Sequence, residues 1–312
     1  MSQSRRTHPY IPNAVPEVKA AMLAAVGAAS VDDFYADIPE SLRLRRPLDL
    51  PPAIGSEVEL VRHVEGLLGR NTSTREALSF LGAGCYAHHV PAVCDEINGR
   101  GEFLTAYAGE PYEDHGRVQA LFEYESMMGE LLERDVVNVP TYDGFQAAGT
   151  AIRMAARATG RRIALVPASM GADKRSKVAD YVRPDVDLVP VPADPATGGL
   201  DLRALERLLA EHGDGVACVF AENPTFLGSL EANGPWIVEL AHAAGALAVV
   251  SVDPSLLGVV APPSAWGADI DCGDIQPLGM HPGWGSGHGG FIASRSEEHT
   301  SELQSRGLIS YA

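Results

Sequence analysis

The sequence predicts an α/β fold in which helices cover both faces of a mostly parallel sheet. From residue 161 to residue 252, short apolar runs rich in valine alternate with longer amphipathic runs. The connections between these runs are short, as in sheets whose parallel strands are joined by helices. The last apolar run, residues 246–252, has no charged side chain, as expected for a strand buried on both faces.

Composition limits the class of protein. The chain has 312 residues, of which 46% are hydrophobic. It has no apolar tract of about 18 residues, so we expect a globular protein without a membrane span. A formal net charge of −17 disfavours nucleic acid and anionic membranes as partners. Residues Met1 to His8 lack the apolar core of a signal peptide, which favours a cytoplasmic location. The four cysteines have no CxxC spacing, so we expect them to be reduced and not to bind zinc.

Residues 1–70 are predicted to form an N-terminal helical arm. Two short helices are expected between residues 10 and 44, one from Pro16 and one beginning at the capping residue Ser30. Prolines at positions 47, 51 and 52 indicate an extended connector. A third helix is predicted over residues 56–68, where apolar residues recur at helical spacing. We expect the arm to pack on a large α/β domain, predicted over residues 71–294.

The segment after the arm contains two adjacent histidines and a long helix. Glycines at positions 82 and 84 predict a loop, and a short helix is expected from Pro91. His88 and His89 lie in this loop, but no third histidine or carboxylate lies at ligand spacing. We therefore favour a structural or substrate-contact role for them over a metal site. The long helix is predicted over residues 118–134.

Strands and helices then alternate. We predict strands over residues 162–167, 187–191, 216–221 and 247–252, separated by helices over residues 174–182, 201–212 and 236–244. A helix of small residues precedes them, from Tyr142 through Asp143 and Gly144 to about Thr159. Its start is either a phosphate seat built from free backbone N–H groups or an ordinary capped helix packed closely on a neighbour. Ligands bind at the carboxyl ends of parallel strands, where this helix start and Asp253 should lie.

The stretch from Ala246 to Phe291 resembles the cofactor site of pyridoxal-phosphate enzymes of the aminotransferase type. An apolar strand ends on Asp253, a second short strand follows, and a glycine-rich run leads to Phe291. In that layout the acid pairs with the pyridine nitrogen, and a lysine after the second strand forms the Schiff base. Here that place holds Gln276, Pro277 and Leu278, and the three lysines, Lys19, Lys174 and Lys177, all lie upstream. We therefore expect that this chain does not hold the cofactor covalently.

A set of short motifs extends this likeness. The motifs are Phe80-Leu-Gly-Ala-Gly-Cys-Tyr86, Glu102-Phe-Leu-Thr-Ala-Tyr107, Tyr142-Asp-Gly144, Asn223-Pro-Thr-Phe-Leu-Gly228, His242, Asp253-Pro-Ser-Leu-Leu-Gly258, Gly267-Ala-Asp-Ile270 and Gly279 with the glycine run after it. In this order they resemble the glycine cleavage system P-protein family over about residues 8–294, and in particular its α, or N-terminal, subunit. Two loops depart from the family pattern, residues 108–115 and residues 287–289.

The resemblance implies a fold and an activity. The fold is the large domain of the pyridoxal-phosphate-dependent transferases of fold type I, with the smaller C-terminal domain missing. The activity is that of glycine dehydrogenase (decarboxylating), an oxidoreductase of glycine catabolism, which works as a heteromer. Glycine is decarboxylated, and its aminomethyl group passes to the lipoyl group of the H-protein.

The resemblance also implies how the two subunits divide the site. The lysine-bearing β subunit would bind pyridoxal phosphate covalently, and this chain would not. Tyr142, Asp143, Gly144 and Asp253 are implied to be relic or cavity-lining residues of the cofactor site. No catalytic residue and no metal ligand is assigned to this chain.

Two other functions remain open on the sequence. The chain could be a non-catalytic scaffold or regulatory pseudo-enzyme that keeps the fold and binds a partner. It could also be a self-sufficient pyridoxal-phosphate lyase or desulfurase, which the missing lysine disfavours.

Residues 295–312 are predicted to be a non-native tail. The run from Arg295 to Ser305 and the last four residues resemble the conceptual translation of a common sequencing-library adapter, with three variable residues between them. The alternative is a natural charged helix. We leave this segment out of the predicted fold and expect the family-like part to end near Ser294.

Overall fold

The computed structural model describes residues 10–295, except residues 12, 14, 47, 75, 81–84, 102–114 and 286. The chain divides into two units, Met1–Thr72 and Ser73–Ala312. The predicted adapter-like segment beyond Arg295 and almost all of the departing loop at 108–115 lie outside the described residues. The division into arm, large domain and tail therefore stays a prediction.

The described part of the N-terminal unit consists of short helices. It contains α1 (Pro16–Ala25), α2 (Glu57–Leu68) and two 3-10 turns, Val31–Tyr35 and Glu40–Leu42. Ser30 caps the first turn: its hydroxyl accepts a hydrogen bond from Asp32 N at 3.2 Å, and Asp33 Oδ2 accepts one from Ser30 N at 3.0 Å. The predicted starts near Pro16 and Ser30 are confirmed. The second element differs from the predicted helix in being a 3-10 turn of five residues that begins at the capping box.

Seven strands form one sheet in the described part of the C-terminal unit, in the order β1-β7-β6-β5-β4-β2-β3. The strands are β1 (Val136–Val137), β2 (Ile163–Pro167), β3 (Asp187–Val191), β4 (Val216–Asn223), β5 (Leu247–Val252), β6 (Ile270–Asp274) and β7 (Gly290–Ser294). Strands β2 to β6 run parallel, whereas β7 is antiparallel to both β6 and β1. The mostly parallel sheet is thus confirmed.

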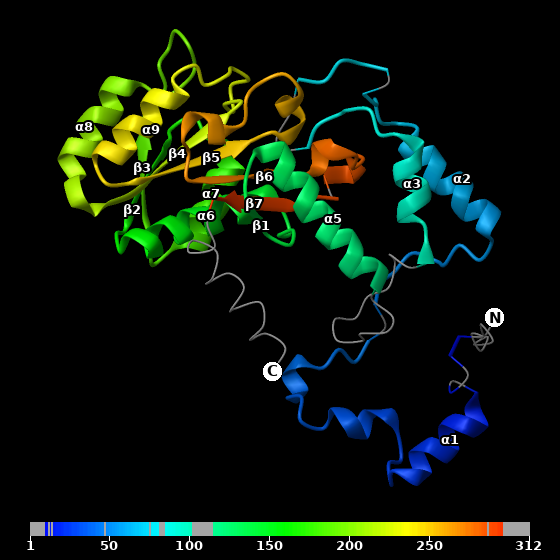
Figure 1. Ribbon diagram of the computed structural model, residues 1–312. Coiled ribbons are helices and arrows are strands. Elements are labelled where there is room, and N and C mark those ends of the chain that lie inside the picture. Colours follow the sequence, from blue (N-terminus) through cyan, green and yellow to red (C-terminus); the bar gives the residue numbers. More distant parts are fainter. Residues whose placement is uncertain are drawn as a thin grey trace. The chain divides into compact units, whose positions relative to one another are not determined.

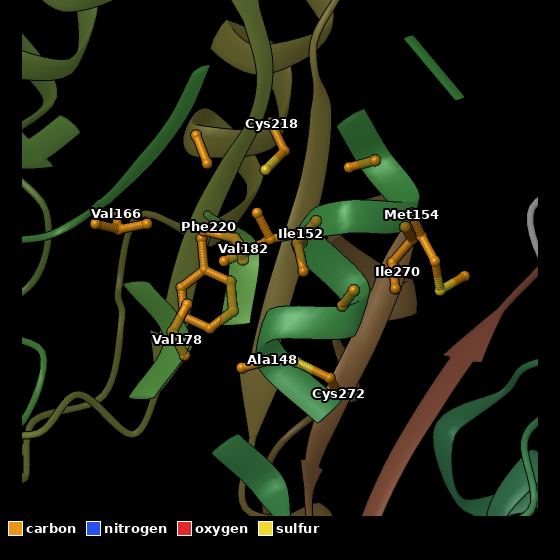
Figure 2. Packing of buried hydrophobic residues seen from close by; sticks show 14 of the residues in the cluster. Ala148, Ile152, Met154, Val166, Val178, Val182, Cys218, Phe220, Ile270 and Cys272 are labelled. Atoms are coloured by element: carbon orange, nitrogen blue, oxygen red, sulfur yellow. The ribbon is translucent and has the colours of Figure 1, made fainter. Parts of the chain in front are cut away.

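Helices α6 to α9 cover the two faces of this sheet (Figure 1). The helices in the described part of the unit are α3 (Ala92–Asn98), α5 (His115–Leu132), α6 (Gly144–Thr159), α7 (Ala172–Val182), α8 (Leu202–His212) and α9 (Gly234–Ala243). Alternate side chains of a strand point to opposite faces. In β4, Phe220 packs with α6 and α7 (Figure 2), whereas Val219 packs with α8 and α9. Every helix predicted within the alternation is present.

Short 3-10 turns connect the later elements. They are Gly213–Gly215, Pro254–Gly258, Pro263–Trp266, Gln276–Leu278 and Gly283–Gly285. Two of them, Pro254–Gly258 and Gln276–Leu278, directly follow the ends of β5 and β6 at the carboxyl edge of the sheet. Within the described ranges, no helix is long and apolar enough to cross a membrane.

A buried ion pair ties the segment after α5 to β6. Arg134 Nε donates to Asp271 Oδ2 at 2.6 Å, and Arg134 Nη2 donates to Asp271 Oδ1 at 2.8 Å and to Ala268 O at 2.7 Å. Both side chains have no exposed surface. Burial raises the pKa of Asp271, and the guanidinium of Arg134 opposes that rise. A two-pronged contact of this kind holds α5 in register with the sheet.

Candidate functional site at the carboxyl edge of the sheet

A cavity of about 170 Å³ lies at the carboxyl ends of β4, β5 and β6. The strand ends contribute Glu222, Ser251, Asp253 and Asp274, and the first turns of α6 and α7 contribute Gly144 and Lys174. Ligands bind at this edge in open α/β sheets, at the carboxyl ends of the parallel strands. The cavity is therefore the candidate functional site.

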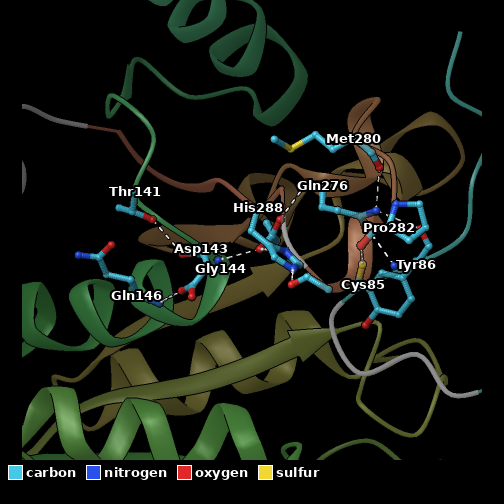
Figure 3. Close-up of polar contacts among 12 residues, drawn as sticks. Cys85, Tyr86, Thr141, Asp143, Gly144, Gln146, Gln276, Met280, Pro282 and His288 are labelled. Atoms are coloured by element: carbon cyan, nitrogen blue, oxygen red, sulfur yellow. Dashed lines mark hydrogen bonds and ion pairs between the residues drawn. The ribbon is translucent and has the colours of Figure 1, made fainter. Parts of the chain in front are cut away.

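The start of α6 is an anion seat that the chain fills with its own carboxylates (Figure 3). Asp143 caps the helix, since its Oδ1 accepts a hydrogen bond from Gln146 N at 2.7 Å. Gly144 N donates to Asp274 Oδ2 at 2.9 Å. Of the two interpretations left open by the sequence, the structure supports the capped helix packed closely on a neighbour.

Asp274 is held in the anion seat by further donors. Gln276 N donates to Asp274 Oδ1 at 2.8 Å, and His288 Nδ1 lies 3.1 Å from Asp274 Oδ2. A Cβ atom at position 144 would lie only 2.9 Å from Asp274 Cβ, so glycine at this position permits the close approach. We define the anion seat as Gly144 N, Gln276 N and the imidazole of His288.

Gln276, at the place where a Schiff-base lysine was sought, has a structural role instead. Its side chain is fully buried. The amide oxygen accepts from Tyr86 N at 3.2 Å, and the amide nitrogen donates to Tyr86 O at 3.1 Å and to Met280 O at 2.9 Å (Figure 3). All these partners are backbone atoms, so Gln276 fastens the Tyr86 segment to the carboxyl edge of the sheet.

Lys174 lies in the cavity, although it is far upstream of the place where the family layout has its Schiff-base lysine. Its Nζ lies 2.6 Å from Glu222 Oε1 and 3.0 Å from Ser251 Oγ. Burial lowers the pKa of Lys174, but the Glu222 carboxylate, together with Cys272 and Tyr86, raises it, and the net pKa lies above its usual value. The 2.6 Å contact with the Glu222 carboxylate favours the charged ammonium form of Lys174 over a nucleophilic amine. Its position at the start of a helix that follows a parallel strand was the sequence signal for this location.

The predicted cofactor-site residues are only partly brought together. Gly144 and Asp253 line the cavity, whereas Tyr142 and Asp143 do not. Tyr142 is 88% exposed. Asp253 Oδ1 accepts from Ser255 N at 2.9 Å and from Ser255 Oγ at 2.7 Å, which ends β5 in a 3-10 turn. The relic role assigned to these four residues stays a prediction.

His88, the first of the paired histidines, has backbone partners. His88 Nδ1 lies 3.0 Å from Tyr86 O, and Gly279 N donates to His88 Nε2 at 3.3 Å. Within the described part of the chain, no group of three or more histidine, cysteine, aspartate or glutamate residues could hold a metal ion. The backbone contacts of His88 agree with a structural role, one of the two roles, structural or substrate contact, that the sequence favours over a metal site.

The residues of this cavity do not fit pyridoxal phosphate. A carboxylate already accepts from the backbone N–H that would bind the phosphate, and it would repel a second anion. The residue at the lysine place is bonded to backbone atoms, and the nearby Lys174 is paired with Glu222. The groups that would have to bind the cofactor already have partners within the chain. We therefore assign this chain no reaction step that uses pyridoxal phosphate.

The anion seat yields a first prediction. In Asp274→Ala, its donors lose their internal carboxylate, so inorganic phosphate from solution should bind there and raise the melting temperature by about 2–4 °C at ten times its Kd. Asp180→Ala, which removes an exposed carboxylate from α7, is the matched control. Differential scanning calorimetry with and without phosphate measures the shift. An equal rise in melting temperature on adding phosphate to the unmodified chain would contradict the claim that the Asp274 carboxylate occupies the anion seat.

The family match and the curated relatives point to the same protein family. The chain matches the glycine cleavage system P-protein family over residues 8–308. This match includes most of the segment predicted to come from an adapter, whose origin stays a prediction. The chain is 41% identical over 292 residues to the probable glycine dehydrogenase (decarboxylating) subunit 1 of Geobacillus kaustophilus, covering 93% of this chain and 63% of the relative. The same-named protein of Anaeromyxobacter dehalogenans is 41% identical over 305 residues, covering 96% of this chain and 65% of that protein.

Solved structures agree with these relatives. A crystal structure of glycine decarboxylase (P-protein) of the glycine cleavage system, in inhibitor-bound form, matches with a TM-score of 0.76 and 37% identity, over 95% of this chain and 63% of that one. The sphingosine-1-phosphate lyase of Burkholderia pseudomallei matches with a TM-score of 0.58 and 14% identity, over 84% of this chain and 64% of that chain, and shows likeness of fold alone. The predicted fold of pyridoxal-phosphate-dependent enzymes is confirmed. The chain spans about two thirds, 63–65%, of the length of these relatives.

Proposed function

Because this chain belongs to the glycine cleavage system P-protein family, we propose that it acts as the α subunit of a glycine decarboxylase. Its partner is a β subunit that carries the cofactor lysine and binds pyridoxal phosphate. The substrate is glycine, and the lipoyl group of an H-protein accepts the aminomethyl group. We place this heteromer in the cytoplasm.

The filled anion seat is the observation that best supports this division of labour. Decarboxylation of an amino acid requires an electron sink, which pyridoxal phosphate supplies when it is bound. In this chain the carboxylate of Asp274 takes the place of a phosphate, and the one lysine of the cavity is held as a charged ion pair with Glu222. The electron sink must therefore come from another subunit.

The contribution of this chain is positioning. Its residues are proposed to complete the wall of the site in the β subunit and to guide the lipoyl arm toward it. Holding a reactant in the correct orientation lowers the entropic part of the barrier without any proton transfer. This role needs no catalytic residue in the chain.

Carbon exchange between glycine and bicarbonate tests the proposal. The chain should copurify with the lysine-bearing β subunit, and exchange should require both chains, with the H-protein raising the rate. A β subunit whose cofactor lysine is replaced by alanine is the control, and its complex should be inactive.

Two outcomes would count against the proposal. Full exchange by the β subunit alone, unchanged when this chain is added, would leave only the scaffold function. Exchange by this chain in the absence of any partner would establish a self-sufficient enzyme.

A further inference from the structure

The cavity at the carboxyl edge of the sheet is strongly acidic. Among the residues that the structure describes, four carboxylates line it, those of Asp173, Glu222, Asp253 and Asp274, against one ammonium group, that of Lys174. Each carboxylate repels an anionic ligand and attracts a cation, more strongly where the side chains are shielded from water. The lining therefore selects against phosphate esters and for positively charged groups.

Glu222 gives this cavity a specific anchoring atom. Its side chain is only 8% exposed, and its Oε1 accepts from Lys174 Nζ. Its Oε2 is buried and has no hydrogen-bond partner in the described part of the protein. Buried carboxylate oxygens are normally satisfied by donors, so this atom marks a place for a donor that the chain does not provide.

We propose that this cavity binds a small primary ammonium ion, which donates a hydrogen bond to Glu222 Oε2. A primary ammonium has three N–H donors on a compact cation, so it satisfies the oxygen and offsets the excess of negative charge at once. A metal ion lacks the cluster of ligands it needs within the described residues. The inference rests on the cavity alone and does not depend on the proposed function.

Titration of the purified full chain with methylammonium chloride tests the proposal. A two-heavy-atom ligand reaches a Kd on the order of 10 mM at best, so 100 mM should raise the melting temperature by about 2–4 °C over sodium chloride of equal ionic strength. Tetramethylammonium has no N–H donor and should give no specific rise. An equal rise with potassium chloride would show a site for any monovalent cation and overturn the amine assignment.

Substitutions of the two members of the Lys174–Glu222 ion pair should change the affinity for methylammonium in opposite directions. Glu222→Gln should weaken methylammonium binding at least tenfold, whereas Lys174→Gln frees the carboxylate and should strengthen it at least tenfold. Glu239→Gln changes the net charge equally at an exposed position on α9 and should leave the affinity unchanged. Isothermal titration calorimetry at fixed pH measures all three.

Because the two substitutions should change the methylammonium affinity in opposite directions, their effects can be distinguished from a general loss of structure. If Glu222→Gln and Lys174→Gln were both misfolded, both would lose methylammonium binding. Their melting curves would reveal the misfolding. No detectable binding to the unmodified chain, or weaker binding in a folded Lys174→Gln variant, would overturn the proposal and leave water as the partner of Glu222.

Discussion

Replacing Arg134 by methionine is expected to lower the free energy of unfolding by about 3–5 kcal/mol. The variant keeps much of the packing volume but leaves Asp271 buried and unpaired, with both carboxylate oxygens deprived of their donors. An uncompensated buried charge is among the most destabilising changes that one substitution can produce. Urea unfolding followed by circular dichroism measures the change.

The matched control is Arg153→Met. Arg153 also pairs with an aspartate, Asp185, at 2.7 Å, but that carboxylate is 55% exposed. Exposed pairs contribute about 0–1 kcal/mol, so this control should stay within that range. A cost below about 1 kcal/mol for Arg134→Met would show that Asp271 is hydrated or protonated in the folded state.

The decrease in the free energy of unfolding caused by Arg134→Met, called the deficit below, should also depend on pH. Burial raises the pKa of Asp271, and the variant removes the guanidinium that opposes the rise. In the variant, the folded state therefore binds the Asp271 proton more tightly than the unfolded chain does. Stability is then lost as pH rises from the ordinary aspartate pKa through the raised pKa of the folded variant, so the deficit should be smallest at and below about pH 4 and should grow toward neutrality.

The fold could be predicted from the sequence because its signals are local. The buried strands β4 and β5 contain continuous apolar runs, residues 216–221 and 247–250, and the helices that alternate with the parallel strands show amphipathic periodicity within a dozen residues. Strand β1 has only two residues, Val136 and Val137, and exists because β7 pairs with it. A pairing of that kind leaves no periodic pattern for sequence reasoning to detect.

The site was harder to predict because its contacts join distant parts of the chain. Lys174 and Glu222 are 48 positions apart, and Gly144 and Asp274 are 130 apart. The absence of a lysine after β6 was visible in the sequence, but the side chain that fills the seat was not. Asp274 is the last residue of β6, and only the close approach of Gly144 makes it the internal anion.

Replacing Glu222 by glutamine is expected to make Lys174 reactive. Without the carboxylate, burial is the main remaining influence on the Lys174 ammonium, and burial lowers its pKa. A lower pKa increases the fraction of neutral amine, and the rate of its reaction with an aldehyde should therefore rise at least about tenfold at neutral pH. Reductive methylation with formaldehyde and cyanoborohydride, followed by peptide mass spectrometry, measures the rate at each lysine.

Lys177 is the internal reference for this experiment. It lies one turn along α7 with its Nζ 4.7 Å from the centre of the Phe145 ring, exposed to solvent and outside the cavity lining. The ratio of Lys174 to Lys177 modification should rise in Glu222→Gln and stay constant in the charge-matched Glu239→Gln. A variant that simply unfolds would expose Lys174 and raise the ratio only to that of a denatured sample, in which the two lysines react alike. A ratio unchanged from the unmodified chain would show that Glu222 does not hold the ammonium in its charged form, and that the ion pair is not what keeps this amine unreactive.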